Sequence, residues 1–236
     1  MQILEELEFL LKEKKYRDLD NLFNKTLPKT TNLDIFKIYI KYIKEINSSF
    51  LLSAYEYSIQ RLWFHYDLYE IIKEYNLIQT DLNKRMFVYK IGLNNPIKDL
   101  NLLYQDFLNE KLDLPQKNEF TTAYNESLTL LIKLEPFLQN ESENFSKIIG
   151  LEKEERKLKI IKYFFEKYPR NEEIYFIFGE ECKDFLKVER YLKKGIKITD
   201  STSLKLYYSL YFKSTKFLDL RNEKMALIYF NLKKTE

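Results

Sequence analysis

Apolar and aromatic side chains recur along most of the chain at intervals of three and four residues, with Lys, Glu and Asn between them. This spacing is typical of amphipathic helices, which bury one face and expose the other. Short polar or proline-containing stretches interrupt the pattern and mark the helix ends. The pattern predicts helices over residues 2–14, 16–26, 33–46, 49–63, 67–76, 80–92, 98–110, 115–134, 137–147, 152–167, 171–183, 185–197, 202–214 and 220–234.

Two series of markers indicate that these helices form pairs, repeated about every 34 residues. In the first helix of a pair, two large residues lie three positions apart, and the first of them recurs after 33, 35, 71 and 33 residues. In the partner helix, a large residue is followed three positions later by a smaller one. The first series is Phe36 and Tyr39, Tyr69 and Ile72, Tyr104 and Phe107, Tyr175 and Phe178, and Tyr208 and Tyr211. The second series is Phe23 and Thr26, Tyr55 and Ser58, Tyr89 and Gly92, and Leu192 and Gly195.

The period predicts an all-α, right-handed solenoid of antiparallel helix pairs, in which each pair packs on the one before it. The aromatic markers are the expected packing residues. Small residues such as Gly92 and Gly195 let two helix backbones approach each other. Pro28, Pro96 and Pro169 end partner helices, because proline cannot continue a helix.

The repeat pattern weakens around residues 135–151, where a proline, a polar run and a glycine follow the long helix expected at 115–134. A break of this kind separates two helical arrays. We therefore expect an N-terminal array at 1–135, a junction at 136–150 and a second, partial array at 151–236.

The composition favours helices and disfavours several other classes. Only 4 glycines and 5 prolines occur in 236 residues, too few for the turns of a β-sandwich or barrel. No apolar run approaches the length of a membrane span, and a single cysteine cannot form an internal disulfide. The net charge of +3 is far below that expected of a strongly basic nucleic-acid-binding domain.

The chain has few residues of the types that carry catalytic or metal chemistry. One histidine, His65, and one cysteine, Cys182, lie 117 positions apart, and we expect His65 to cap or pack at a junction between helices. Cys182 follows Glu180 and Glu181, a setting that does not favour a reactive thiolate. The glycines form no phosphate-binding motif. We therefore expect neither an enzyme nor a cofactor, metal or small-molecule site.

The most specific segment is residues 88–125, VYKIGLNNPIKDLNLLYQDFLNEKLDLPQKNEFTTAYN. A partner helix ends at the Asn-Pro pair 95–96, and the next helix carries Tyr104, Asp106 and Phe107 before a long helix begins. This segment resembles the half-a-TPR (HAT) repeat scaffold subunit of cleavage stimulation factor, the suppressor-of-forked family.

The resemblance extends over residues 16–134 and, more generically, over 150–214, with Phe36 where the family usually has tryptophan. It implies a nuclear scaffold of pre-mRNA 3′-end cleavage and polyadenylation, whose partners are other protein subunits of that machinery. It also implies dimerisation through the second array. The chain departs from the family by ending within that array, before the proline-rich tail with which members engage their RNA-binding partner.

Two alternatives remain open. A HAT-repeat scaffold of the spliceosome is the nearest, although it would not be expected to carry the Asn-Pro segment. Direct RNA binding is the other, and its support is a basic stripe on one predicted helix. The stripe consists of Lys187, Arg190, Lys194 and Lys197. We expect a solvated face there, because no exposed aromatic residues alternate with the cations as single-strand binding requires.

Overall fold

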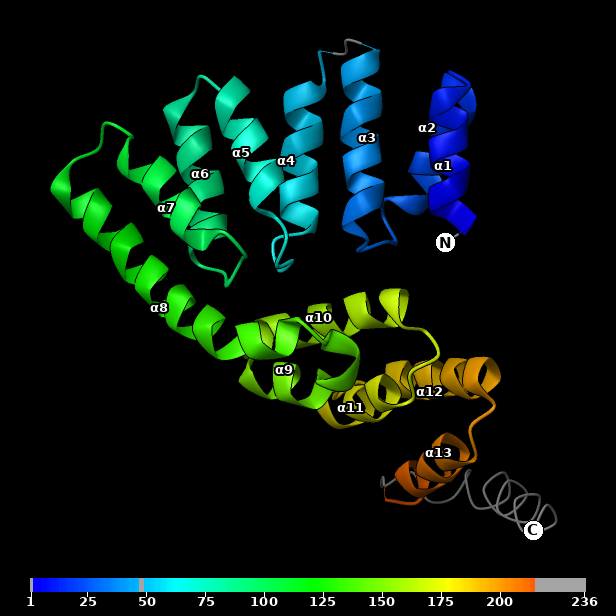
Figure 1. The fold of residues 1–236 in the computed structure, drawn as a ribbon. Coiled ribbons are helices and arrows are strands. Elements are labelled where there is room, and N and C mark those ends of the chain that lie inside the picture. Colours follow the sequence, from blue (N-terminus) through cyan, green and yellow to red (C-terminus); the bar gives the residue numbers. More distant parts are fainter. Residues whose placement is uncertain (1, 47–48, 215–236) are drawn as a thin grey trace. The chain divides into compact units, whose positions relative to one another are not determined.

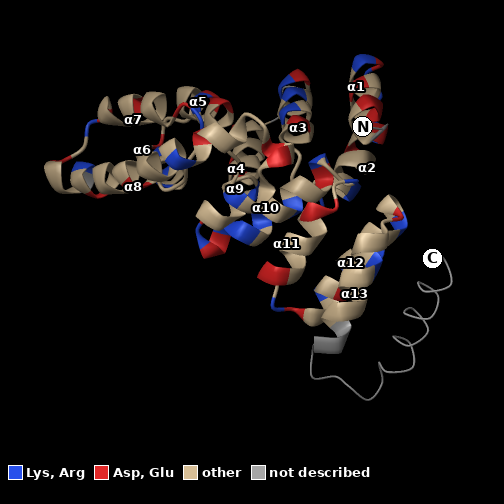
Figure 2. Cartoon of the chain, turned by 60° about the horizontal axis from the view of Figure 1, so that its bottom comes forward, with Lys and Arg blue, Asp and Glu red and all other residues tan. Residues whose placement is uncertain are grey.

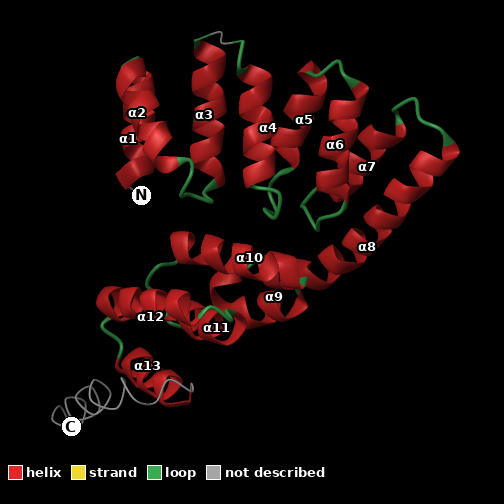
Figure 3. Ribbon diagram, turned by 180° about the vertical axis from the view of Figure 1, so that it is seen from behind, coloured by secondary structure: helices red, strands yellow, loops and turns green. Residues whose placement is uncertain are grey.

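The computed structural model describes residues 2–46 and 49–214. These residues form thirteen α-helices and one short 3-10 helix, and they contain no strand (Figure 3). The first helices are α1 (Gln2–Lys12), α2 (Tyr16–Thr26), α3 (Leu33–Glu45), α4 (Leu51–Arg61), α5 (Tyr69–Ile78), α6 (Leu82–Leu93), α7 (Leu100–Leu108) and α8 (Leu114–Leu138). They are followed by η1 (Glu141–Glu143), α9 (Phe145–Leu151), α10 (Glu154–Lys167), α11 (Glu173–Glu181), α12 (Phe185–Thr199) and α13 (Thr202–Ser214). The predicted all-α class is confirmed, and the helix predicted at 220–234 lies outside the described residues.

The bounds of α1–α7 and α10–α13 agree with the predicted ones to within two residues. Short polar side chains fix the start of four of these helices. Asn32, Asp81, Asp184 and Ser201 each accept a hydrogen bond of 2.9–3.1 Å from a backbone N–H in the first turn of the helix that follows. Such caps satisfy amide groups that have no partner within the helix.

The prediction of a helix at 137–147 is wrong. Helix α8 continues through Pro136 to Leu138, and α9 begins only at Phe145. Proline removes one backbone hydrogen bond, and the helix tolerates this loss because Pro136 lies in its last turn. The polar run that follows forms the 3-10 turn η1, whose Glu141 accepts hydrogen bonds from two side chains at the end of α10.

The chain divides into two compact units, residues 1–136 (unit 1) and residues 137–236 (unit 2). In unit 1, consecutive helices run antiparallel and pack side by side (Figure 1). The first helices of neighbouring pairs also touch, since α1 contacts α3 and α5 contacts α7. Unit 2 repeats this arrangement, with α11 packed on α9, α10, α12 and α13.

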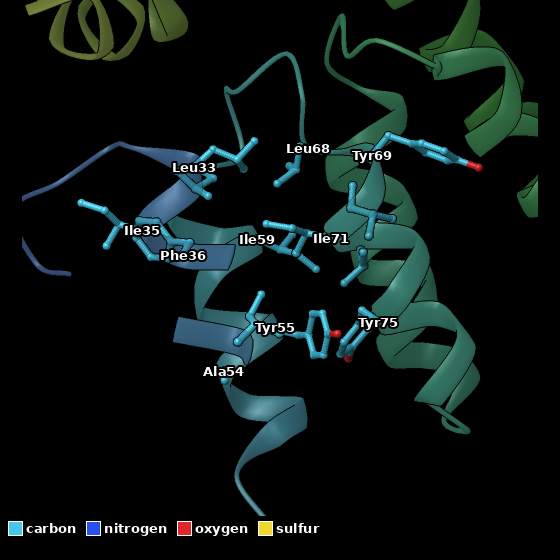
Figure 4. Packing of buried hydrophobic residues seen from close by; sticks show 14 of the residues in the cluster. Leu33, Ile35, Phe36, Ala54, Tyr55, Ile59, Leu68, Tyr69, Ile71 and Tyr75 are labelled. Atoms are coloured by element: carbon cyan, nitrogen blue, oxygen red, sulfur yellow. The ribbon is translucent and has the colours of Figure 1, made fainter. Parts of the chain in front are cut away.

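Aromatic rings fill the space where helix pairs of unit 1 meet. Figure 4 shows Tyr55 of α4 pointing toward Tyr75 of α5, with Phe36 of α3 nearby, and all three are at most 1% exposed. The rings of Tyr55 and Tyr75 lie 6.3 Å apart, and those of Tyr89 and Phe107 lie 5.6 Å apart. Aromatic pairs at these distances add to the free energy of burial, so each pair of helices is fixed against the next.

Unit 2 has its own aromatic core. Phe145 of α9 packs on Phe164 of α10 with ring centroids 4.6 Å apart. Phe165 of α10 contacts Tyr175 and Tyr191, which lie on α11 and α12. The three helices α10, α11 and α12 are therefore joined through a single side chain.

A buried ion pair also lies in unit 2, at the start of α10. The Nε of Arg156 donates to Glu152 Oε2 at 2.7 Å, and both side chains have no exposed surface. A buried charge without a partner is costly, so each of these residues requires the other. The sequence reasoning overlooked this pair, although a four-residue spacing of opposite charges is its usual signal.

Candidate functional site

The residues predicted to define the repeat lie in the contacts between helices. Phe36, Tyr55, Tyr69, Tyr89, Gly92, Pro96, Phe107, Tyr175, Phe178, Gly195 and Tyr208 are buried, and Tyr39, Tyr104 and Tyr211 are half-buried. The half-buried rings still stack on neighbours: Tyr104 lies parallel to Tyr124 of α8 with centroids 3.9 Å apart. The structure thus places these side chains between helices and not in a pocket.

The two glycines predicted as packing residues, Gly92 and Gly195, lie where helices approach each other closely. A Cβ atom at Gly92 would overlap Leu103 Cδ2 of α7 and lie 3.0 Å from Ile72 Cδ1 of α5. At Gly195 a Cβ atom would lie 2.6 Å from Tyr175 Cδ1 of α11. Neither site has room for a side chain without movement of its neighbours.

Sequence reasoning missed a third close approach, at Gly179 of α11. A Cβ atom there would overlap the hydroxyl oxygen of Tyr207 and lie 2.8 Å from its Cε1. The signal was present, because Gly179 follows Phe176 by three positions. The large-then-small pattern predicts close approaches only in partner helices, whereas α11 is the first helix of its pair.

The Asn-Pro segment forms the turn between α6 and α7. Asn95 donates from Nδ2 to the Ile91 carbonyl at 2.7 Å, and Pro96 is buried. Two residues later, the Lys98 amide donates to the Tyr66 carbonyl at 2.7 Å, which links this turn to the preceding α4–α5 turn. The segment therefore holds two successive repeats together at one edge of unit 1.

A polar network crosses the surface between α3, α4 and α5. Lys44 Nζ donates to Glu74 Oε2 at 2.8 Å, and the Tyr55 hydroxyl donates to the same oxygen. Burial raises the pKa of Tyr55 to about 12, and the hydrogen bond to Glu74 acts in the same direction. Burial opposes ionisation of Glu74, but the hydrogen bonds from Lys44 and Tyr55 outweigh it and lower the pKa of the carboxyl group.

This network borders a groove of about 350 Å³ between α3 and α5, which we call the α3–α5 groove. Its lining consists of Lys37, Ile40, Lys41, Lys44, Glu70, Ile71 and Glu74. The two isoleucines are buried and form the base, whereas the charged side chains are exposed and form the rims. All three lysines come from α3 and both glutamates from α5, so the two rims carry opposite charge.

A second groove of about 370 Å³ lies between α6 and α8. Lys90 of α6 and Asn94, which follows that helix, face Glu119 and Glu126 of α8 across it. Lys90 Nζ is 3.3 Å from Glu119 Oε1, so the opposite charges on its two sides already meet. This groove offers less unpaired charge than the α3–α5 groove.

The structure brings the predicted basic stripe together on the exposed face of α12. Lys187, Arg190, Lys194 and Lys197 are all exposed. The two aromatic rings of α12 do not lie among them, because Phe185 stacks on Tyr211 and Tyr191 stacks on Phe165. A face without free rings offers charge to a nucleic acid but no platform for stacked bases. Across the described helices, blue and red segments are interspersed (Figure 2).

His65 and Cys182 have local structural contacts. His65 is buried in the α4–α5 turn, where its Nδ1 accepts the Asp67 amide at 3.1 Å. Cys182 is buried at the end of α11, with Sγ 3.8 Å from the Asp184 carbonyl. In the part of the chain that the structure describes, no group of three or more His, Cys, Asp or Glu side chains could hold a metal ion. None of the helices in this part of the chain is long and apolar enough to span a bilayer.

Paired antiparallel helices, aromatic contacts between pairs and small residues at the crossings define a helical-repeat protein. No protein-family model matches the chain, and no curated protein matches it. Among solved structures, the crystal structure of CstF-77 has the same fold, with a TM-score of 0.79 and 24% sequence identity. The match covers 99% of this chain and 57% of that one, so the chain spans little more than half of CstF-77. The resemblance inferred from the sequence is confirmed at the level of the fold.

Proposed function

We propose that this protein is a non-catalytic scaffold that holds together protein subunits of the nuclear machinery for pre-mRNA 3′-end cleavage and polyadenylation. The observation that carries the proposal is the fold match to CstF-77, the HAT-repeat subunit of cleavage stimulation factor, over 99% of the chain. Helical-repeat arrays of this kind present extended surfaces on which other proteins dock.

The charges and side chains on the described surfaces are better suited to binding proteins than to binding RNA. The α3–α5 groove and the groove between α6 and α8 each carry acidic as well as basic side chains, and the acidic side chains would repel phosphate groups. The basic stripe on α12 is exposed, yet the rings of that helix are stacked on neighbouring helices. RNA contact is therefore proposed to be indirect or weak, and dimerisation through unit 2 belongs to the same proposal.

Affinity capture from nuclear extract, followed by mass spectrometry, tests this function. The tagged protein should enrich subunits of the cleavage and polyadenylation machinery, and treatment with ribonuclease should leave the enrichment unchanged. Enrichment of splicing factors in their place would contradict the proposal and favour the spliceosomal alternative. Capture that disappears with ribonuclease would favour direct RNA binding.

A further inference from the structure

The α3–α5 groove carries more unpaired charge than the groove between α6 and α8, and its charged side chains form two rows. Lys37, Lys41 and Lys44 follow one another at intervals of four and three residues, so they form one row along α3. The row is about 10 Å long, which corresponds to two turns of a helix. Glu70 and Glu74 form a parallel, shorter row along α5.

The charges of this groove are only partly neutralised within the chain. Lys44 is paired with Glu74 at 2.8 Å. Among the described residues, no carboxylate lies within ion-pair distance of Lys37 or Lys41, and no cation lies within that distance of Glu70. Like charges four residues apart on a helix repel each other, so the pair Lys37 and Lys41 stabilises α3 less than a mixed pair would. A ligand with two carboxylates would remove this repulsion.

We propose that the α3–α5 groove binds a short acidic segment of a partner protein, with two carboxylates of the segment paired to Lys37 and Lys41. An aliphatic side chain of the segment then lies over Ile40 and Ile71 at the base, and a basic side chain pairs with Glu70. The inference rests on the proposed function, since it assigns one docking site to the protein scaffold.

The same charges argue against RNA as the occupant. A phosphate backbone that reached Lys37 and Lys41 would lie beside Glu70, whose charge would repel it. Among the described residues, no aromatic side chain lines the groove, so unpaired bases would find no ring there to stack on. A peptide can present opposite charges on two sides of one segment, as the two rims of the groove require.

Binding of designed peptides to the whole protein tests the proposal. The probe is a fluorescein-labelled peptide of about 12 residues, in which two glutamates four positions apart flank leucines. A second peptide has lysines in place of these two glutamates. Fluorescence anisotropy should show saturable binding of the acidic peptide, weakened by added salt, and no comparable binding of the lysine peptide.

Variants of the two unpaired lysines identify the site. Lys37→Glu with Lys41→Glu should weaken binding of the acidic peptide by roughly tenfold or more and strengthen binding of the lysine peptide. The matched control is Lys25→Glu with Lys29→Glu, which has the same spacing and charge change at the end of α2, outside the groove, and should bind as the wild type does. Lys37→Gln with Lys41→Gln supplies a neutral version if the reversal disturbs the fold, which circular dichroism would reveal.

Three results would overturn the inference. The acidic peptide could bind no better than the lysine peptide, or the reversal and its control could weaken binding equally. A uridine oligonucleotide of about 12 nucleotides could bind more tightly than the peptide and lose its affinity when Lys37 and Lys41 are replaced, which would assign the groove to RNA.

The same experiments separate this inference from the proposed function. If the peptide does not bind while capture from nuclear extract still yields the cleavage and polyadenylation subunits, only the groove assignment is wrong. If the peptide does not bind and the capture also fails, the scaffold proposal is wrong as well.

Discussion

At the scale of single residues, three of the glycines mark positions where neighbouring helices leave no room for a side chain. Gly92, Gly179 and Gly195 lie where a Cβ atom would meet another helix at less than van der Waals distance. Gly150 is helical too, but nothing lies within 4 Å of the position a Cβ atom would take. Glycine is unfavourable inside a helix, so the first three are explained by packing and the fourth is not.

Replacing two of these glycines with alanine should therefore change stability in opposite directions. Gly92→Ala should lower the free energy of unfolding by about 1–3 kcal/mol, because the added methyl group overpacks the contact with Leu103. Gly150→Ala should raise it by about 0.5–1 kcal/mol, because alanine favours the helix and meets no neighbour. Urea titration measures both values. A Gly92 variant as stable as the wild type would show that the assigned repeat register is wrong.

The buried pair of Arg156 and Glu152 gives a second prediction at this scale. Arg156→Met should cost about 3–5 kcal/mol, because it removes the guanidinium group that pairs with the buried Glu152 carboxylate. Replacing both residues, with Glu152→Leu added, should cost less than the single change. Thermal unfolding compares the two variants, and a double variant less stable than the single one would refute this account of the pair.

At the scale of helices, the periodic pattern was sufficient to predict most elements, because each amphipathic helix carries its signal in its own residues. The region after α8 was mispredicted because Glu141 is held by Lys167 and Tyr168, which lie 26 and 27 residues further along the chain. The row of lysines on α3 can also be predicted from the sequence, because a spacing of four and three residues places these side chains on one face of a helix. Its position opposite Glu70 depends on the packing of α5 beside α3, which local spacing does not reveal.

The contact between α4 and α5 should make the protein sensitive to high pH. Burial raises the pKa values of Tyr55 and Tyr75 to about 12, whereas tyrosine in an unfolded chain titrates near 10. A raised pKa stabilises the fold below about pH 10, and this contribution disappears as the pH rises toward about 12. The urea midpoint should therefore fall between about pH 10 and pH 12.

Tyr55→Phe combined with Tyr75→Phe provides the control for this effect. The variant has no hydroxyl group to ionise at either position, so its midpoint should fall less steeply over the same pH range. An equally steep fall in both proteins would mean that other groups, such as the many lysines, cause the alkaline loss of stability.

At the scale of the whole molecule, the repeat predicts that a disturbance stays close to its origin, because each helix pair contacts only its neighbours. Within unit 1, Gly92→Ala should speed amide hydrogen exchange in α5, α6 and α7, whose side chains surround the substituted position. Exchange in α1 and α2 should remain as in the wild type. Faster exchange throughout unit 1 would show that it unfolds as one cooperative body.

The scaffold function is tested most directly by a 3′-end cleavage assay in nuclear extract from which the protein has been depleted. Depletion should reduce cleavage of a pre-mRNA substrate, and the purified protein should restore it when added back to the depleted extract. The purified protein alone should not cleave the same substrate. Undiminished cleavage after depletion, or cleavage by the purified protein alone, would contradict a non-catalytic scaffold of this machinery.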